Sequence, residues 1–97
     1  MTPLRIRRAA RQDMAAIWAY TARAWGHDQA DAYVTALSHD IDRLRTFPEI
    51  GAPHPSRHGQ FRKLVSGHHL IFYLVGQDGV DVVRVLHQRM DTGRWLG

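Results

Sequence analysis

The stretch HLIFYLVGQDGVDVVRVLH, residues 69–87, decides the fold. It contains two runs of mainly apolar residues, 69–75 and 80–87, separated by the segment Gly76-Gln-Asp-Gly79. Val, Ile, Phe and Tyr favour strands, and a short segment with glycine at both ends favours a tight turn. The stretch therefore predicts an antiparallel hairpin. Because both strands are apolar on both faces, we expect helices to cover one side and something else to cover the other.

Further strands are predicted on either side of this hairpin. Residues 60–65 form one, joined to residue 69 by a turn at Ser66-Gly67, which gives a three-stranded antiparallel meander. The segment before it, from Phe47 to Gly59, is rich in proline and glycine and predicts a loop. Near the N-terminus, residues 4–7 alternate apolar and cationic side chains, the pattern of a half-buried strand.

Between the first strand and the loop, the hydrophobic period becomes that of a helix. From about Ala9 one apolar stripe follows helical spacing, and its members are Met14, Ile17, Trp18, Thr21 and Trp25. Gly26 ends this helix, because glycine tolerates the backbone conformation that follows a last helical turn. The first predicted helix therefore covers about residues 9–25.

A second stripe continues from Ala30 to Leu44. Asp28 is the predicted N-cap of this helix, and Pro48 stops it near Thr46. One or two residues separate the helices, so they fold back as an antiparallel hairpin. The predicted architecture is α+β: an N-terminal strand, an αα-hairpin and a three-stranded antiparallel meander. Residues after Met90 are expected to form a loose tail, although Trp95 is costly to leave in water.

Length and composition bound the function. The 97 residues suffice for one domain, residues 1–97. The absence of cysteine excludes disulfides, zinc–thiolate sites and thiol catalysis. The N-terminus has no apolar segment typical of a secretory signal, and the longest apolar run, residues 70–75, is too short to span a bilayer. We therefore expect a cytoplasmic protein with no membrane contact.

The charge is unevenly distributed along the chain. Lys and Arg number 13 against 9 Asp and Glu, a net charge of +4, and no acidic residue occurs from Ile50 through Gln77. A basic surface in that acid-free stretch favours an anionic partner, either nucleic acid or an acidic protein segment. The same balance also occurs in small soluble proteins that have no anionic partner.

Four residues are candidates for phosphate chemistry: Arg62, Lys63, Arg84 and His87. His87 could serve as a general acid or base, with the cations stabilising a transition-state phosphate. Strand alternation, however, places Arg84 and His87 on opposite faces unless a bulge intervenes. The alternative is structural: an ion pair of Arg84 with Asp81 or Asp91, and a hydrogen-bonded His87.

No metal or cofactor is expected. His54 and His58 have the spacing of helical metal ligands, but they lie among prolines and glycine. His68 and His69 are adjacent, so on a strand they face opposite ways. No Gly-rich phosphate loop, nucleophile elbow or paired-carboxylate motif is present.

An ordered set of short motifs resembles the ParE toxins of bacterial type II toxin–antitoxin modules. The motifs are Ala9-Ala10-x-x-Asp13-Met14-x-x-Ile17-x-x-Tyr20, Trp25-Gly26-x-x-Gln29-Ala30-x-x-Tyr33, Leu44-x-x-x-Pro48-x-x-Gly51, Phe61-Arg62-Lys63, Gly67-x-His69-x-Ile71-x-Tyr73 and Val83-Arg84-Val85-Leu86-His87-Gln88-Arg89-Met90-Asp91. The resemblance covers essentially the whole chain, and the last motif is the most specific. It implies the RelE/ParE-type fold, a sheet packed on a helical hairpin, in agreement with the periodicity.

The resemblance also implies partners. A ParE-like toxin poisons DNA gyrase, without catalytic residues, and is neutralised by a ParD-like antitoxin that alone contacts operator DNA. The implied target-binding candidates are Arg84, His87, Arg89, Met90, Asp91 and Trp95. The implied antitoxin-binding candidates are Trp18, Trp25, Tyr33, Leu37, Arg57, Arg62 and Lys63.

Two alternatives stay open. RelE-like members of the same superfamily cut mRNA on the ribosome, and here Arg62, Lys63, Arg84 and His87 would carry that reaction. The lack of a Tyr after the last strand favours the ParE branch. A third reading is a degenerate toxin that only binds its antitoxin.

Overall fold

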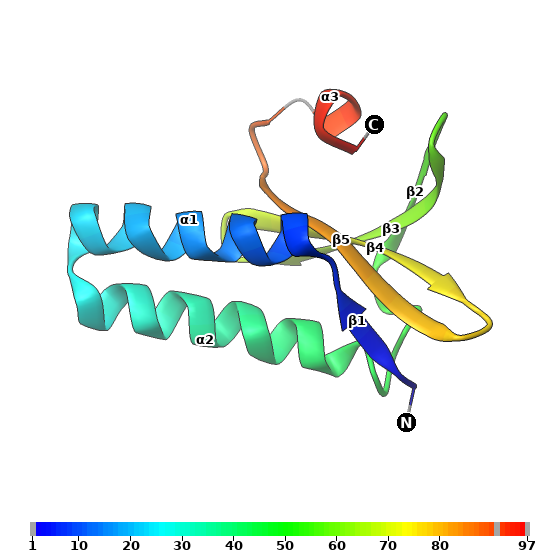
Figure 1. Ribbon diagram of the computed structural model, residues 1–97, viewed down its shortest axis with the longest axis horizontal. Helices are drawn as coiled ribbons and strands as arrows, with labels where there is room; N and C mark the ends of the chain where they lie inside the picture. The colour runs from blue at the N-terminus through cyan, green and yellow to red at the C-terminus, as the bar shows by residue number, and fades with distance from the viewer. Residues whose placement is uncertain (1, 91, 97) are drawn as a thin grey trace.

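A five-stranded mixed sheet and a helical hairpin form the body of the protein (Figure 1). The computed structural model describes residues 2–90 and 92–96. Its elements, in chain order, are β1 (Leu4–Ile6), α1 (Arg8–Trp25), α2 (His27–Arg43), β2 (Ala52–Ser56), β3 (Gly59–Ser66), β4 (His69–Gly76), β5 (Gly79–His87) and α3 (Thr92–Leu96). The strand order is β1-β5-β4-β3-β2, with β1 parallel to β5 and the other pairs antiparallel. The predicted α+β class, helical hairpin and meander are confirmed.

The two helices meet at Gly26, whose φ of 96° lies in the region that favours glycine. Gly26 ends α1 and also serves as the N-cap of α2. The predicted N-cap, Asp28, instead lies in the first turn of α2, where its charge suits the positive end of the helix dipole. The far end of the hairpin projects beyond the sheet (Figure 1).

The predicted loop over residues 47–59 is partly wrong. Its second half is the edge strand β2, which pairs with β3 so that His54 lies opposite Phe61. The prolines at 53 and 55 hid this strand, since proline argues against a central strand. At an edge they are tolerated, because their alternate spacing turns both ring nitrogens away from β3.

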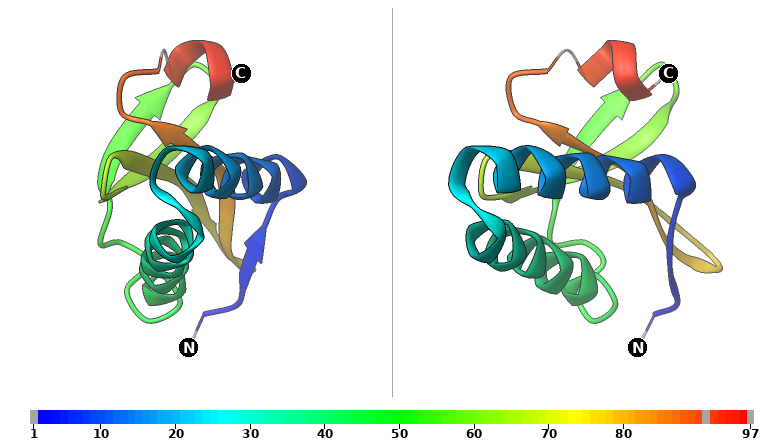
Figure 2. Two further views of the ribbon diagram at one scale, coloured as in Figure 1. Left: turned by 90° about the vertical axis from the view of Figure 1, so that its left-hand side faces the viewer. Right: turned by 60° about the vertical axis from the view of Figure 1, so that its left-hand side comes forward.

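The sheet carries a hydrophobic cluster on each face. The cluster under α1 and α2 consists of Ala10, Leu37, Ile41, Leu44, Ile71, Tyr73, Val80, Val82 and Val85. The other cluster consists of Phe61, Phe72, Val83, Leu86 and Leu96. Leu96 belongs to α3, so the expected loose tail is wrong for residues 92–96: they form a short helix that covers the second face (Figure 2).

A register shift in the hairpin of β4 and β5 aims one side chain. Phe72 pairs with Arg84 and Tyr73 with Val82, so Val83 is the extra residue of a β-bulge. From Arg84 to His87 the pairing is regular again. Arg84 and His87 therefore start from opposite faces of the sheet, as alternation predicts. None of the helices in residues 2–90 and 92–96 has the length and apolar character needed to cross a membrane.

Candidate functional site

Arg84 lies where the edge of β5 is no longer covered by β1, which pairs only with residues 80–82. Its Nε and Nη2 donate to the two carboxylate oxygens of Asp13 in α1, at 2.8 and 2.7 Å. The backbone N–H of Val85 donates to the same carboxylate at 2.9 Å. Asp13 thus provides the hydrogen-bond acceptor for the Val85 N–H that a neighbouring strand would otherwise provide. The partner of Arg84 is Asp13, not the expected Asp81, and Asp91 lies outside the described residues.

The Arg84–Asp13 pair is largely shielded from water. The side chains of Arg84 and Asp13 are 19% and 14% exposed. The hydrogen bonds that Arg84 donates to Asp13 raise the pKa of Arg84 above its ordinary value, although burial acts in the opposite direction. Arg84 therefore acts as a structural cation that is already paired with a carboxylate, rather than as a free guanidinium that could bind an anionic ligand.

The same guanidinium contacts the C-terminal helix. Arg84 Nη1 donates to the backbone carbonyl of Trp95 at 3.2 Å. Its Cζ lies 5.5 Å from the centre of the Trp95 ring, within the range of a cation–π contact. The Trp95 side chain still presents part of its surface to solvent, since this residue is 42% exposed.

Asp81 forms a second carboxylate–arginine cluster at the β1 end of β5. Arg7 Nε donates to its Oδ2 at 2.8 Å, and Arg5 Nη2 lies 3.4 Å from the same oxygen. Burial opposes ionisation of Asp81, but the bonds from Arg7 and Arg5 outweigh it and hold its pKa below the usual value. Within the described residues, Asp81 Oδ1 is buried without a hydrogen-bond partner.

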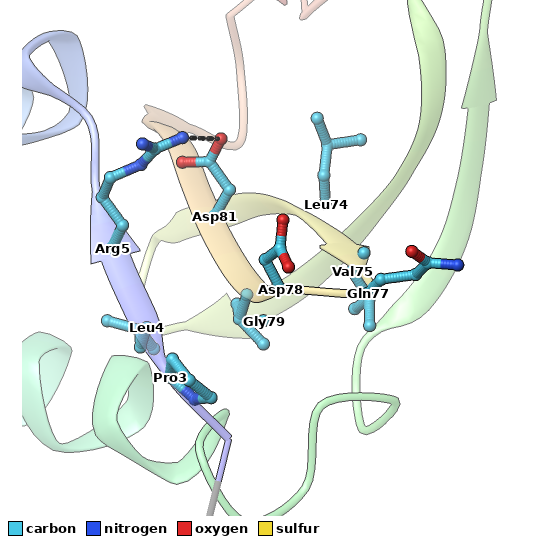
Figure 3. A pocket seen from close by; sticks show the side chains of 11 residues that line it. Pro3, Leu4, Arg5, Leu74, Val75, Gln77, Asp78, Gly79 and Asp81 are labelled. Carbon is cyan, nitrogen blue, oxygen red and sulfur yellow. Dashed lines mark hydrogen bonds and ion pairs between the residues drawn. The ribbon is translucent and has the colours of Figure 1, made fainter.

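This cluster borders a hollow of about 650 Å³ between β1 and the turn that joins β4 to β5. Figure 3 shows Arg5 directed toward Asp81, while Asp78 and Gln77 project from the turn. Gly79 closes the base of the hollow: its φ is +127°, and a side chain there would collide with the Pro3 carbonyl. The groups that line this hollow are not arranged for acid–base or metal chemistry. We therefore interpret it as a gap left by the packing of β1 against the turn, not as a functional site.

A second hollow, the hairpin groove, lies where the helical hairpin projects past the sheet. It has a volume of about 620 Å³ and is lined by Ala16, Ile17, Tyr20, Thr21, Trp25, Gln29, Tyr33, His68, His69 and His87. Tyr20 is 65% exposed and Trp25 is 75% exposed. Aromatic side chains left this open to water are typical of a surface that another molecule covers.

The inner wall of the hairpin groove is a hydrogen-bonded network. The Tyr33 hydroxyl accepts from the His68 backbone N–H at 2.9 Å and lies 2.6 Å from Nδ1 of His69. Because one lone pair is used by His68, the hydroxyl can donate its proton to Nδ1 of a neutral His69 ring, whose own proton is then on Nε2. Burial, with the nearby His87 and His68, lowers the pKa of His69 to about 4.

His87 is also engaged locally. Its Nδ1 accepts the backbone N–H of Arg89 at 3.1 Å, and its ring centre lies 5.3 Å from that of His69. Among the described residues, no group of three or more His, Cys, Asp or Glu side chains is arranged to hold a metal ion.

The four residues expected for ribonuclease chemistry do not gather around one point. Arg62 donates from Nη1 to the carbonyls of Gly51 and Glu49, at the loop before β2. Lys63 pairs across the sheet with Phe72, on the face opposite His87. Arg84 forms an ion pair with Asp13, and His87 lines the hairpin groove.

The structure separates the expected antitoxin-binding residues, of which Arg62 and Lys63 were described above. Trp25 and Tyr33 line the hairpin groove. Leu37 is 1% exposed and belongs to the core, and Trp18 donates its indole N–H to Asp31 at 2.8 Å. Arg57 is exposed in the β2–β3 turn, away from the groove. Of the target-binding candidates, Arg89 is exposed and Met90 packs against the second cluster.

Sequence reasoning missed four contributors: Asp13, Tyr20, His68 and His69. Tyr20 could have been found from the helical wheel, because it lies outside the apolar stripe of α1. The role of Asp13 had no local signal, since its partner Arg84 lies 71 residues away.

Known proteins resemble this chain along nearly its full length. The family model described as the ParE toxin of the type II toxin–antitoxin system parDE matches residues 4–92. Toxin ParE1 of Mycobacterium tuberculosis (strain H37Rv) is 46% identical over 89 residues, 91% of each chain. Toxin ParE1 of Caulobacter vibrioides is 37% identical over 97 residues, 100% of both. A chain in the solved structure of a chromosomal ParDE toxin–antitoxin system from P. aeruginosa aligns with a TM-score of 0.79, at 21% identity, over 90% of this chain and 96% of that one.

Proposed function

The chain belongs to the ParE toxin family of type II toxin–antitoxin systems, and from that premise we propose that it inhibits DNA gyrase and is neutralised by a ParD-like antitoxin. It is thus the toxin of a ParDE system. The target and the antitoxin type form the proposed part. The observation that carries the proposal is the pair of surfaces described above, an open apolar groove on the hairpin and a short C-terminal helix with a half-exposed Trp95.

The hairpin groove supports a protein partner. Tyr20 and Trp25 offer two large aromatic faces at its mouth, and burying such faces is the main source of affinity in helix-in-groove recognition. The neighbouring histidines bring no negative charge, and the whole stretch from residue 50 to 77 lacks acids. An antitoxin segment with large apolar side chains therefore fits the groove, and acidic residues of the same antitoxin would meet the acid-free stretch outside it.

The net charge of +4 does not require this chain to bind DNA, because the antitoxin can supply the DNA-binding surface. An acidic antitoxin tail would neutralise the acid-free stretch, and the operator DNA would then be contacted by the antitoxin alone. This follows the family expectation.

The C-terminal segment supports a target contact separate from the antitoxin groove. Arg89 and Trp95 are exposed, and α3 lies on the sheet face opposite the hairpin. The scattered positions of Arg62, Lys63, Arg84 and His87 favour inhibition by binding over RNA cleavage, because phosphoryl chemistry needs its groups around one phosphorus.

The antitoxin part is tested by Trp25→Ala, with Phe47→Ala as matched control. Phe47 is also a largely exposed aromatic, at 58%, but it lies outside the hairpin groove. We expect Trp25→Ala to weaken antitoxin binding by about tenfold or more, measured by titration calorimetry, and Phe47→Ala to change it by less than about threefold. Equal affinities for wild type and Trp25→Ala would contradict the assignment of the groove.

The target part is tested with purified toxin in a gyrase supercoiling assay, with and without a ParD-like antitoxin. We expect inhibition that the antitoxin reverses. Full gyrase activity, together with mRNA cleavage at ribosomal positions in arrested cells, would instead support the RelE-like endoribonuclease.

A further inference from the structure

One side chain, Arg84, contacts both the first and the last helix of the described chain. Its Nε and Nη2 hold Asp13 in the second turn of α1, and its Nη1 holds the Trp95 carbonyl in α3. The bulge at Val83 precedes it directly and directs the side chain to the free edge of β5. A single guanidinium therefore links α1 to α3.

The C-terminal helix has little else to hold it. It spans Thr92–Leu96, five residues, which is far below the length at which a helix persists in water. Its described anchors are the Leu96 side chain in the second cluster and the two contacts of Arg84 with Trp95. Removing the Arg84 contacts would leave Leu96 as the main attachment.

Asp13 determines how Arg84 meets this helix. A two-oxygen contact with Nε and Nη2 fixes the plane of the guanidinium, whereas a single contact would let it rotate. With that plane fixed, Nη1 points to the Trp95 carbonyl and the guanidinium lies within 5.5 Å of the Trp95 ring centre. The bond from the Val85 N–H keeps the Asp13 carboxylate itself in place.

We propose that Asp13 is a positioning residue for the C-terminal segment: it acts through Arg84 to hold α3 on the sheet and to present Trp95 to the target. Arg84 then contributes to target binding through the placement of Trp95, not by direct contact. The presentation of Trp95 to gyrase rests on the proposed function, whereas the attachment of α3 does not.

The test compares Asp13→Asn with Asp81→Asn in the full chain. Both carboxylates accept hydrogen bonds from arginine at an edge of β5, and their side chains are 14% and 17% exposed. Asp81 contacts Arg5 and Arg7 and has no link to α3. The readout is amide hydrogen exchange of residues 93–96 in the isolated toxin, together with global stability from urea unfolding.

We expect Asp13→Asn to speed exchange in α3 about tenfold or more beyond the change caused by Asp81→Asn, at comparable global stability. Arg84→Lys should have the same local effect, because lysine keeps the charge but cannot make the planar double contact. Unchanged α3 exchange in Asp13→Asn, or equal acceleration by Asp81→Asn, would overturn the proposal.

A second measurement connects this attachment to the target. In the supercoiling assay, Asp13→Asn and Trp95→Ala should each weaken inhibition, and the double variant should be no weaker than Trp95→Ala alone. If α3 is released but Asp13→Asn inhibits like wild type, the positioning role is wrong. If wild-type toxin does not inhibit gyrase, the proposed target fails, and the exchange result alone then decides the attachment of α3.

Discussion

The two faces of the sheet are covered very differently. On one face α1 and α2, of 18 and 17 residues, bury Ile71, Tyr73 and Val82 to 0% exposure. On the other face the five-residue α3 covers a smaller cluster, in which Phe72 is 0% exposed but Val83 and Leu96 keep 7% and 8% exposure. Because nine buried residues form the cluster under the helices and five form the other cluster, we expect the first face to contribute more to the folding free energy. The second face is closed by an element that can be changed at small cost. For the proposed target contact this division means that the C-terminal segment can adjust without unfolding the core.

The largest effect is expected from Leu37→Ala on the helix face. Leu37 is 1% exposed within the cluster between helices and sheet, so its truncation removes buried methyl groups and leaves a cavity. We expect a loss of about 3 kcal/mol in the free energy of unfolding, measured by urea denaturation. Ser38→Ala, at an exposed neighbouring position, should change it by less than about 0.5 kcal/mol. A small effect of Leu37→Ala would mean that the two faces contribute more equally than their burial indicates.

A smaller loss is expected from Tyr73→Phe, which removes one atom from the same face. The buried Tyr73 hydroxyl accepts the Gly51 backbone N–H at 2.8 Å. Phenylalanine would leave that N–H without a partner, at a cost of about 1–2 kcal/mol. Urea unfolding measures the loss, and faster amide exchange of Gly51 should accompany it. Retained protection of Gly51 would contradict this role.

Acid should destabilise the protein through His69 at the end of the same face. Burial, with His87 and His68, lowers the pKa of His69 to about 4, so the folded state favours the neutral ring. The stabilisation is complete above the ordinary histidine pKa of about 6.5 and is lost as the pH falls from there toward about 4. After solvent screening we expect a loss on the order of 1 kcal/mol.

The measurement for His69 is urea unfolding at several pH values. His69→Gln should flatten the profile between pH 6.5 and 4, while His58→Gln, at an exposed turn position, should leave it unchanged. A profile that stays equally steep in His69→Gln would assign the acid sensitivity to other groups.

The smallest effect on global stability is expected from Leu96→Ala on the second face. Its helix is short and lies at the end of the described chain, so it can detach without opening the core. We expect a loss of about 1 kcal/mol or less by urea unfolding, with faster amide exchange restricted to α3. A loss as large as that of Leu37→Ala would remove the distinction between the two faces.

Sequence periodicity predicted the elements that have a strong local pattern. The helical hairpin followed from its apolar stripes and Gly26, and the meander followed from β-branched runs and glycine turns. Periodicity did not predict β2, because Pro53 and Pro55 resemble loop residues until a neighbouring strand makes them an edge. The short α3 was missed for a similar reason, since five residues form a helix only where tertiary contacts hold them.

The candidate site was less predictable than the fold. Strand alternation correctly separated Arg84 from His87, but the partner of Arg84 was out of reach because Asp13 lies on another element. The spacing of Trp25 predicts a core residue, yet Trp25 is 75% exposed because the hairpin extends past the sheet. The length by which one element overhangs another is a tertiary property, and no local pattern encodes it.

The prolines of β2 have a consequence for the protein at high concentration. Their ring nitrogens lie along the outer margin of the sheet, so this margin presents carbonyl acceptors without the matching N–H donors. Two copies of the chain therefore cannot join along it by continuous strand pairing, which is a common first step of fibre growth. The β2 edge therefore protects the free protein against polymerisation by strand pairing at this side of the sheet.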